Sequence, residues 1–595
     1  MTRTPLRPLA RILSARQKGE NPDVIERENI RLRHEAMRDR ARQRAEGRLL
    51  VLTLFFVLAF GAVGARMGLM AAEEPSEPRA SAPGSRIVAQ RADIVDRRGR
   101  ILATNLQTNS LYAQPPNMVD PKGAVDALLK IFPDLDRDRL LKDFTGSRKF
   151  LWIKRKISPE QQQAVHDIGE PGLLFGPREM RLYPNGKLAA HILGGYGFGR
   201  EGVYAAEVIG TAGVEKAFDE FLRDPAEQGR PLELSIDLTV QAAVERVLYG
   251  GMRLMNAKGA TAVMMDVTTG ELVAMASLPD FDPNTRPAPL TRGDQSDSPL
   301  FNRAVQGVYE LGSVYKIFTA AQAMELGLVN AQSNVDAKAP FVWGKYKIKE
   351  FQGKNYGPFL SVTDVVVKSS NVGTANLAMM IGPERQQEFY KKLGFFDPTP
   401  VELVEAHGAK PLIPKRWSEI VMITASYGHG FSTSPLQLAT GYASILNGGL
   451  RVTPTLVKQQ GPRLGERVVA EEVSVAARDM LRQVVVRGTA SFGEVPGYAV
   501  GGKTGTADKP DPKGGYYENK VIATFAGVFP ANDPKYVLVV TLDEPVETSG
   551  PEPRRTAGWT AVPVAAEIIR RSAPLLGLRP AIEPGAVNAL TLTSN

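Results

Sequence analysis

The sequence predicts an α+β protein with one membrane-spanning helix near its N-terminus. Strand patterns stand at both ends of the region that begins near Leu232, and mostly helical patterns lie between them. This order favours one antiparallel sheet whose strands come from distant segments. An uncharged run, Leu49 to Ala65, predicts the membrane helix, and a mixed region, residues 87–230, lies between the two.

Length and composition limit the possible classes of protein. The chain has 595 residues, which is too long for one typical domain. A hydrophobic content of 43% and a charged content of 23% are ordinary for a folded protein. There is no cysteine, so disulfides and thiolate metal sites are excluded. The five histidines form no HxxH or HExxH pair, so we expect no metal centre.

The basic N-terminal arm leads directly into the uncharged run. Residues 1–48 hold 13 Lys/Arg and 7 Asp/Glu, so six of the nine net positive charges lie there. Such an arm can bind nucleic acid, but here it precedes a candidate membrane span. A cleaved signal peptide would need a charged region of 48 residues, and no clear A-x-A site follows. We therefore predict a cytoplasmic tail (1–48), an uncleaved anchor (49–72), no nucleic-acid partner, and all later residues outside the cytoplasm.

The segment after the anchor divides into a linker and a mixed region. Residues 73–86 are rich in Pro, Ser and charge, which predicts a linker. Residues 87–230 begin with two short strands around a turn at Asp96–Gly99, and helical patterns follow near Val125–Ile131 and Gly213–Arg223. We find no catalytic cluster there, so we expect a spacer or docking module.

The third predicted region, residues 231–578, carries the sheet. A strand ending at Asp237 precedes a helix, and ATAVMMDV and ELVAMAS form a hairpin around the turn Thr268–Gly270. Three more strands follow far downstream in YAVGGKTGTAD, KVIATFAGVF and KYVLVVTLDEP, and the helix AVPVAAEIIRRSAPLLG closes the region. The tail, residues 579–595, is expected to be loose.

The segment Tyr309–Gly327 reads as an apolar helix that carries Ser313 and, three residues later, Lys316. Residues i and i+3 share a helix face, so the hydroxyl and the amine can meet. A serine needs a base to become a nucleophile, and a lysine with its usual pKa of about 10.4 is a poor base at neutral pH. Burial or a second cation lowers that pKa. The pair therefore predicts a nucleophile and its base; the alternative is an N-cap serine with a lysine that reaches solvent.

Two further stretches strengthen the first interpretation. Ser369–Asn371 lies where one apolar helix ends and another begins, and Lys503–Thr506 lies on a predicted strand that opens with two glycines. Alone, the first is more simply a polar helix junction and the second a glycine-rich edge strand. Together, Ser-x-x-Lys, Ser-x-Asn and Lys-Thr-Gly in this order form the triplet of the penicillin-recognising serine enzymes.

On these residues the chain resembles the class B penicillin-binding proteins, most closely the division-specific septal peptidoglycan transpeptidases. The likeness runs from the anchor to about residue 575 and includes DRRGRILA, RLYPNGKLAAHILG, GVEKAFDEFL, FNRAVQGVYELGS, KSSNVG and ENKVIATFAGVFP. It implies a penicillin-binding transpeptidase fold, in which helices flank a five-stranded antiparallel sheet. It also implies an elongated N-terminal pedestal domain of the dimerisation type at 87–230.

The resemblance also implies catalytic roles. Ser313 would attack the penultimate D-alanine carbonyl of a stem peptide that ends in D-Ala-D-Ala, and Lys316 would accept its proton. Ser369 would pass a proton to the leaving D-alanine, and Asn371 would position Lys316. Lys503 would raise the local positive potential.

Substrate binding is implied in the same way. Thr504, Gly505 and Thr506 would bind the substrate, with the terminal carboxylate at the two threonines. The backbone N–H groups of Ser313 and Thr506 would form the oxyanion hole.

The family also implies partners and a location. β-Lactams would acylate Ser313, and no cofactor or metal is expected. A SEDS-family glycosyltransferase and small division proteins would be partners, at the division septum of the bacterial inner membrane. This sequence departs from the family at Leu311, where proline is usual, and at Asp508, where septal enzymes often carry a basic residue.

Other functions remain as alternatives. A β-lactamase or D,D-carboxypeptidase of the same fold usually lacks an N-terminal span and pedestal, and Ala443 stands where the Glu-x-x-Leu-Asn motif of class A lactamases has its glutamate. An elongation-specific relative is disfavoured by KSSNVG and RWSEI. A non-catalytic scaffold would predict a broken motif, and none is broken. A Ser-His-Asp hydrolase is disfavoured because Gly-x-Ser-x-Gly is absent.

Overall fold

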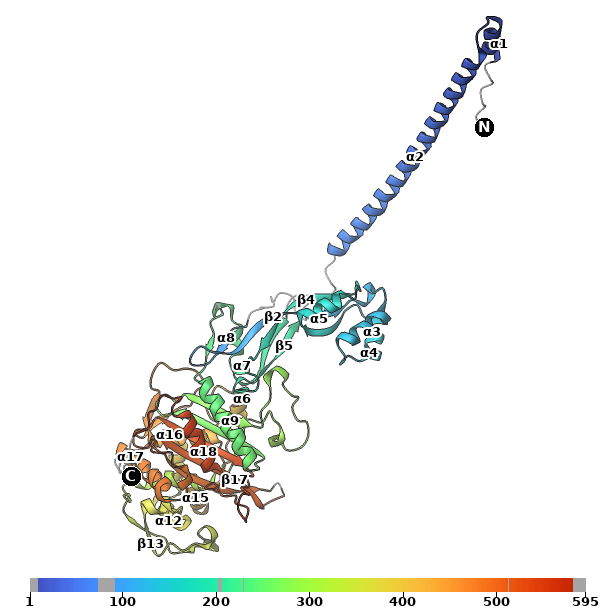
Figure 1. Cartoon of the computed structure of the whole chain (residues 1–595). Coiled ribbons are helices and arrows are strands. Elements are labelled where there is room, and N and C mark those ends of the chain that lie inside the picture. The colour runs from blue at the N-terminus through green and yellow to red at the C-terminus, as the bar shows by residue number, and fades with distance from the viewer. Residues whose placement is uncertain (1–8, 73–90, 202–205, 228, 512, 582–595) are drawn as a thin grey trace, which may run out of the picture. The chain divides into compact units, whose positions relative to one another are not determined.

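The computed structural model describes residues 9–72, 91–201, 206–227, 229–511 and 513–581 (Figure 1). The chain divides into two compact units, residues 1–77 and 78–595. The predicted linker and most of the predicted tail, residues 582–595, lie outside the described residues.

The first unit contains helices α1, Leu9–Gln17, and α2, Pro22–Ala72. Within α2, the span Glu46–Met67 contains an 18-residue window with a mean hydropathy of 2.2, and no residue of that window is buried. The 22 residues of the span extend about 33 Å, enough to cross a bilayer. The hydroxyl of Thr53 donates to the carbonyl of Leu49 at 2.8 Å, so this polar group is satisfied within the helix. The predicted apolar helix is present, and it continues a charged helical stretch.

The pedestal sheet has the strand order β3-β2-β1-β7, and β4 also pairs with β2. The strands are β1 Ile94–Val95, β2 Ile101–Ala113, β3 Leu151–Ile157, β4 Leu173–Leu182 and β7 Leu232–Glu233. Strand β7 runs parallel to β1 and comes from the start of the third predicted region. The sheet therefore links the pedestal to the segment that leads into the larger sheet.

Helices and a hairpin surround this sheet. They are α3 Pro121–Ile131, α4 Arg137–Thr145, α5 Pro159–His166, α6 Ala190–Leu193, α7 Gly213–Ala217, α8 Asp219–Arg223, β5 Gly195–Glu201 and β6 Ala206–Ala212. Helix α3 covers the first predicted helical stretch, and the second is divided at Phe218 into α7 and α8. A small separate core packs α3 and α4 on β2, through residues such as Val125, Leu128 and Phe144.

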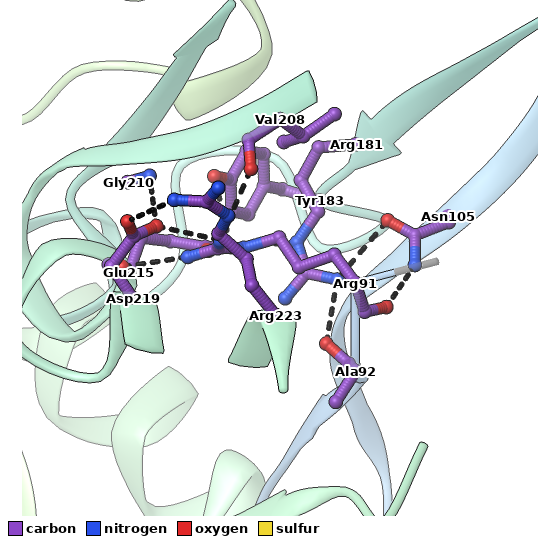
Figure 2. A network of polar contacts seen from close by, with 10 residues as sticks. All are labelled: Arg91, Ala92, Asn105, Arg181, Tyr183, Val208, Gly210, Glu215, Asp219 and Arg223. Atoms are coloured by element: carbon purple, nitrogen blue, oxygen red, sulfur yellow. Dashed lines mark hydrogen bonds and ion pairs between the residues drawn. The ribbon is translucent and has the colours of Figure 1, made fainter. Parts of the chain in front are cut away.

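A buried network of charges ties the pedestal together (Figure 2). The carboxylate of Glu215, which is 0% exposed, accepts hydrogen bonds from Arg91 Nε and Arg181 Nε, both at 2.7 Å. Arg91 also pairs with Asp219 at 2.7 Å, and Arg181 donates to the carbonyl of Ala92 at 2.9 Å. The segment before β1 is thus joined to β4, α7 and α8.

The larger sheet has the all-antiparallel order β16-β17-β18-β8-β9. Its strands are β8 Gly259–Asp266, β9 Leu272–Leu278, β16 Gly501–Pro510, β17 Tyr516–Phe529 and β18 Tyr536–Asp543. The predicted hairpin and the three distant strands are all present. The predicted five-stranded antiparallel sheet, built from both ends of the region, is confirmed.

Long helices cover this sheet. They are α9 Leu238–Leu254, α16 Pro435–Leu446, α17 Glu471–Arg487 and α18 Ala561–Ser572. Helices α9 and α18 pack against each other, α16 packs on β8 and β18, and α17 packs along β16. The strand predicted to end at Asp237 ends at Glu233 and is followed by a single isolated bridge at Leu234. Asp237 instead caps α9, where its carboxylate accepts from the N–H of Thr239 at 2.9 Å.

Shorter elements fill the region between the sheet segments, where helices were expected. The helices are α10 Lys316–Glu325, α11 Val362–Val367, α12 Asn371–Ile381, α13 Pro383–Lys392, α14 Val404–Gly408 and α15 Glu419–Ser426. Short strand pairs are β10 Asn334–Asp336 with β13 Phe359–Ser361, β11 Phe341–Trp343 with β12 Tyr346–Ile348, and β14 Leu450–Val452 with β15 Leu464–Arg467. The 3-10 helices of this region are η3 Pro283–Thr285, η4 Gln295–Asp297, η5 Gly312–Tyr315, η6 Phe351–Gly353 and η7 Ser491–Gly493, and two more, η1 Pro115–Asn117 and η2 Pro225–Glu227, lie in the pedestal.

Candidate active site

Ser313 lies in η5, the 3-10 turn that leads directly into α10. The sequence predicted a single α-helix here, but the first turn is tighter and Lys316 is the first α-helical residue. Gly312 has a φ of 65°, which favours glycine, and opens this turn. Because residues i and i+3 of a 3-10 helix are eclipsed, Ser313 and Lys316 still share one face.

The hydroxyl of Ser313 is half-buried and, within the part of the chain that the structure describes, makes no hydrogen bond. The Lys316 amine donates elsewhere, so the expected direct contact between hydroxyl and amine is not formed in this state. Catalytic hydrogen bonds often form only once substrate is bound.

The Lys316 ammonium is held by three oxygens although its side chain is almost fully buried, at 1% exposure. Its Nζ donates to the carbonyl of Ser369 at 2.6 Å, to Asn371 Oδ1 at 2.7 Å and to Ser369 Oγ at 3.2 Å. Burial, together with the positive charge of Lys503, lowers the pKa of Lys316 well below its usual value, while the negative charge of Glu350 opposes this change. The amine is thereby brought toward the neutral form that a base requires.

The loop between α11 and α12 carries the second motif, as predicted. Ser369 has a φ of 59°, a left-handed conformation that is uncommon for a residue with a side chain. This conformation costs of order 1–3 kcal/mol. Ser369 nevertheless directs both its carbonyl and its hydroxyl at Lys316, and hydrogen bonds to a charged amine are among the stronger ones.

Lys503 approaches the same hydroxyl from the edge strand β16. Its Nζ donates to Ser369 Oγ at 3.0 Å and to the carbonyl of Thr504 at 3.1 Å, and its side chain is 0% exposed. Burial lowers the pKa of Lys503 to about 7. Ser369 Oγ therefore lies between two amines, from α10 and from β16, which places three of the predicted catalytic residues together.

The glycine of the third motif marks a close approach of two backbones. A Cβ atom on Gly505 would lie 2.1 Å from the carbonyl oxygen of Leu311, in the chain just before η5. A strand glycine was expected to mark such an approach, and here it brings the Ser313 turn against β16. The hydroxyl of Thr504 bonds that of Thr489 at 2.7 Å, and Thr506 Oγ1 accepts from the N–H of Ala557 at 3.0 Å.

Two glutamates near these residues were not predicted from the sequence. Glu310 accepts hydrogen bonds from the N–H of Gly430 and the hydroxyl of Tyr516, both at 3.1 Å. Glu350 accepts from the N–H of Asn371 at 2.7 Å. Glu310 adjoins the Ser313 motif in sequence, whereas Glu350 lies in an irregular polar segment that carries no motif or periodicity.

The arrangement can transfer a proton and attract an anion. Lys316 can accept a proton when neutral, and Ser369 Oγ bridges the two amines at 3.2 and 3.0 Å. A protonated Lys503 supplies positive charge beside the hydroxyls of Thr504 and Thr506 on the same strand. Such a site suits acyl transfer from a substrate that carries a carboxylate.

Comparisons with known proteins agree with this chemistry. The family described as the penicillin binding protein transpeptidase domain matches residues 260–570, and the penicillin-binding protein dimerisation domain matches residues 86–229. The chain is 34% identical to the probable peptidoglycan D,D-transpeptidase FtsI of Caulobacter vibrioides over 92% of each chain. It is 31% identical to the peptidoglycan D,D-transpeptidase FtsI of Escherichia coli K12, over 77% of this chain and 80% of that protein.

Solved structures give the same result. Penicillin binding protein 3 of Mycobacterium tuberculosis complexed with ampicillin superposes with a TM-score of 0.63 at 26% identity, over 84% of this chain and 97% of that one. The same protein complexed with aztreonam gives a TM-score of 0.62 at 26% identity, over 83% and 98%.

Proposed function

The chain belongs to the penicillin-binding protein transpeptidase family, and on this premise we propose that it is a peptidoglycan D,D-transpeptidase of septal wall synthesis. It cross-links stem peptides through a serine acyl-enzyme and is a target of β-lactams. The observation that carries this proposal is that the amines of Lys316 and Lys503 both donate to the hydroxyl of Ser369. Lys316 lies one turn after Ser313.

In the first half-reaction, the neutral Lys316 amine takes the proton of Ser313 Oγ. The oxygen attacks the penultimate D-alanine carbonyl, and the bond to the terminal D-alanine breaks. The proton returns to the leaving amine by way of Ser369 Oγ, which accepts hydrogen bonds from both lysines. Asn371 Oδ1, 2.7 Å from Lys316 Nζ, keeps the amine in place during these transfers.

In the second half-reaction, an amine of a neighbouring stem peptide attacks the ester carbon. A new amide forms, the bond to Ser313 Oγ breaks, and the proton lost by the amine restores the Ser313 hydroxyl. A D,D-carboxypeptidase would use water instead.

The third motif is proposed to bind the substrate. The hydroxyls of Thr504 and Thr506 receive the terminal carboxylate beside the Lys503 charge, and the narrow approach at Gly505 keeps β16 against the nucleophile turn. The N–H groups of Ser313 and Thr506 are proposed to stabilise the oxyanion. Leu311, two residues before Ser313, lies close to Gly505, directly before Thr506, and this supports the proposal that these two N–H groups act together.

Fluorescent penicillin labelling of the membrane fraction tests the function. We expect wild type to be labelled, and Ser313→Ala and Lys316→Ala to be unlabelled. Ser491→Ala is the matched control, because Ser491 also lies in a 3-10 helix of the same region and is exposed. Labelling of Ser313→Ala equal to that of wild type would refute the proposed nucleophile.

The location is proposed to be the inner membrane at the septum, with residues 1–48 in the cytoplasm and the remainder beyond the anchor outside it. The apolar span Glu46–Met67 and the basic segment that precedes it support this orientation. A SEDS-family glycosyltransferase and small division proteins are proposed partners. Co-purification of such a glycosyltransferase with the full chain, compared with a chain that begins after residue 72, tests the first of these.

A further inference from the structure

Glu350 is a buried carboxylate that takes no part in the reaction described above. It lies between β12 and η6 and is 3% exposed. Among the residues that the structure describes, no cation forms an ion pair with it. A buried charge without a partner is costly unless hydrogen bonds replace the lost water.

Its hydrogen bonds all come from the start of α12. Oε1 accepts from Ser370 Oγ at 2.5 Å and from the N–H of Val372 at 3.3 Å, and Oε2 accepts from the N–H of Asn371 at 2.7 Å. The free N–H groups of a helix start favour a negative charge, so the carboxylate is stabilised there. The preceding carbonyl, that of Lys349, accepts from Asn371 Nδ2 at 3.0 Å.

Two consecutive residues therefore hold Asn371: Glu350 binds its backbone N–H, and the carbonyl of Lys349 binds its side-chain amide. With Nδ2 bound to a carbonyl, Asn371 must turn Oδ1 toward Lys316 Nζ, where it accepts at 2.7 Å. Ser370 is fixed by the same carboxylate, and Ser369, directly before it, presents its carbonyl to Lys316. All three oxygens around the Lys316 amine thus depend on the segment that Glu350 anchors.

The charged groups that act on Lys316 are Lys503 on β16 and Glu350, with opposite signs. Tyr356, which lies near Glu350, has a pKa raised by burial and stays neutral. Glu350 is thus the nearby negative charge that favours the protonated amine.

We infer that Glu350 is a positioning residue for acyl transfer: it fixes Ser369 and Asn371 around Lys316, and its charge balances the protonated and neutral forms of that amine. This inference rests on the proposed function of the site. It makes Glu350 a determinant of both the rate of acylation and its dependence on pH.

The test is the second-order rate of acylation of the full-length protein by fluorescent penicillin between pH 5 and 9. In Glu350→Gln the shape is kept and the charge is lost, so the Lys316 amine loses its proton more easily. We expect the acid limb of the profile to move to lower pH by about one unit. Glu350→Asp keeps the charge, so its acid limb should stay at the wild-type position.

Glu350→Ala removes both the charge and the hydrogen bonds to α12. We expect its maximal rate to fall about 10- to 100-fold, as displaced catalytic groups do. Glu402→Gln is the control, because Glu402, like Glu350, accepts from a hydroxyl, here Thr455 Oγ1 at 2.6 Å, and from backbone N–H, here that of Leu456 at 2.8 Å. It should reproduce the wild-type profile.

An unmoved acid limb in Glu350→Gln, or a wild-type rate in Glu350→Ala, overturns the inference while wild-type labelling leaves the proposed function intact. If Glu350→Ala does not fold, as a thermal unfolding scan would show, the isosteric Gln variant still decides. Absence of Ser313-dependent labelling in wild type is the separate outcome that removes the proposed function.

Discussion

At the scale of single residues, two buried amines set the range of pH in which the site can act. Lys316 must be neutral to take a proton, and burial and the Lys503 charge lower its pKa. Lys503 must be protonated to supply positive charge, and burial lowers its pKa to about 7. The rate should therefore rise with pH while Lys316 loses its proton, and fall when Lys503 loses its own.

We predict a bell-shaped profile for wild-type acylation by a penicillin, with the alkaline limb near the Lys503 pKa of about 7. Lys503→Arg keeps a positive charge at every accessible pH, so its alkaline limb should disappear. Stopped-flow or gel-based acylation rates from pH 5 to 10 measure both. An alkaline limb that persists unchanged in Lys503→Arg would show that another group causes it.

Individual residues also show how far the sequence determines the site. The motif patterns placed Lys316 on a helix, Ser369 at a junction of two helices and Lys503 on a strand, as the structure has them, because spacing and helix or strand patterns are local properties. Glu350 could not be found in this way, since it meets Asn371 only through folding, across 21 positions that include β13 and α11. The 3-10 turn at Ser313 was missed for the same reason: it depends on contact with β16.

At the scale of elements, the approach of β16 to the nucleophile turn is a steric requirement. A Cβ atom on Gly505 would stand 2.1 Å from the Leu311 carbonyl, and backbone atoms cannot move aside as a flexible side chain can. We predict that Gly505→Ala lowers the acylation rate about 100-fold by displacing β16 from η5. Gly465→Ala on β15 is the control, because its nearest atom is 3.4 Å away. Equal rates for wild type and Gly505→Ala would contradict the steric argument.

The pedestal depends on a different element-level feature, the charge network at Glu215 (Figure 2). Glu215→Gln would leave Arg91 and Arg181 buried with less compensating charge. We predict a loss of about 3 kcal/mol in the free energy of unfolding of the pedestal, measured by urea titration. Glu227→Gln, whose pair with Arg230 is solvent-exposed, should cost under about 1 kcal/mol. Similar losses in both variants would show that the buried network stabilises the pedestal no more than an exposed ion pair does.

At the scale of the whole molecule, the sequence predicted the larger sheet well because β8, β9, β17 and β18 each contain an apolar run, whereas β16 was recognised from its glycine-rich Lys-Thr-Gly segment. The pedestal was predicted less completely. Its helices carry local signals, but β7 pairs with β1 across more than a hundred residues, and no local pattern marks Arg91 and Arg181 as buried. Pairings and networks of this kind depend on distant partners, which a local pattern does not contain.

The membrane topology is the remaining whole-molecule property, and the absence of native cysteine makes it directly testable. The excess of Lys/Arg in residues 1–48 should keep that segment in the cytoplasm, because positive charge next to a span is retained on that side. We therefore predict that Asp138→Cys, exposed on α4, reacts with a membrane-impermeant maleimide once the outer layers of intact cells are made permeable, whereas Glu28→Cys, exposed on α2, does not. After detergent lysis both should react equally, which controls for accessibility. Reaction of Glu28→Cys before lysis would place the basic segment outside the cytoplasm, and the catalytic region would then lie on the side where no peptidoglycan is assembled.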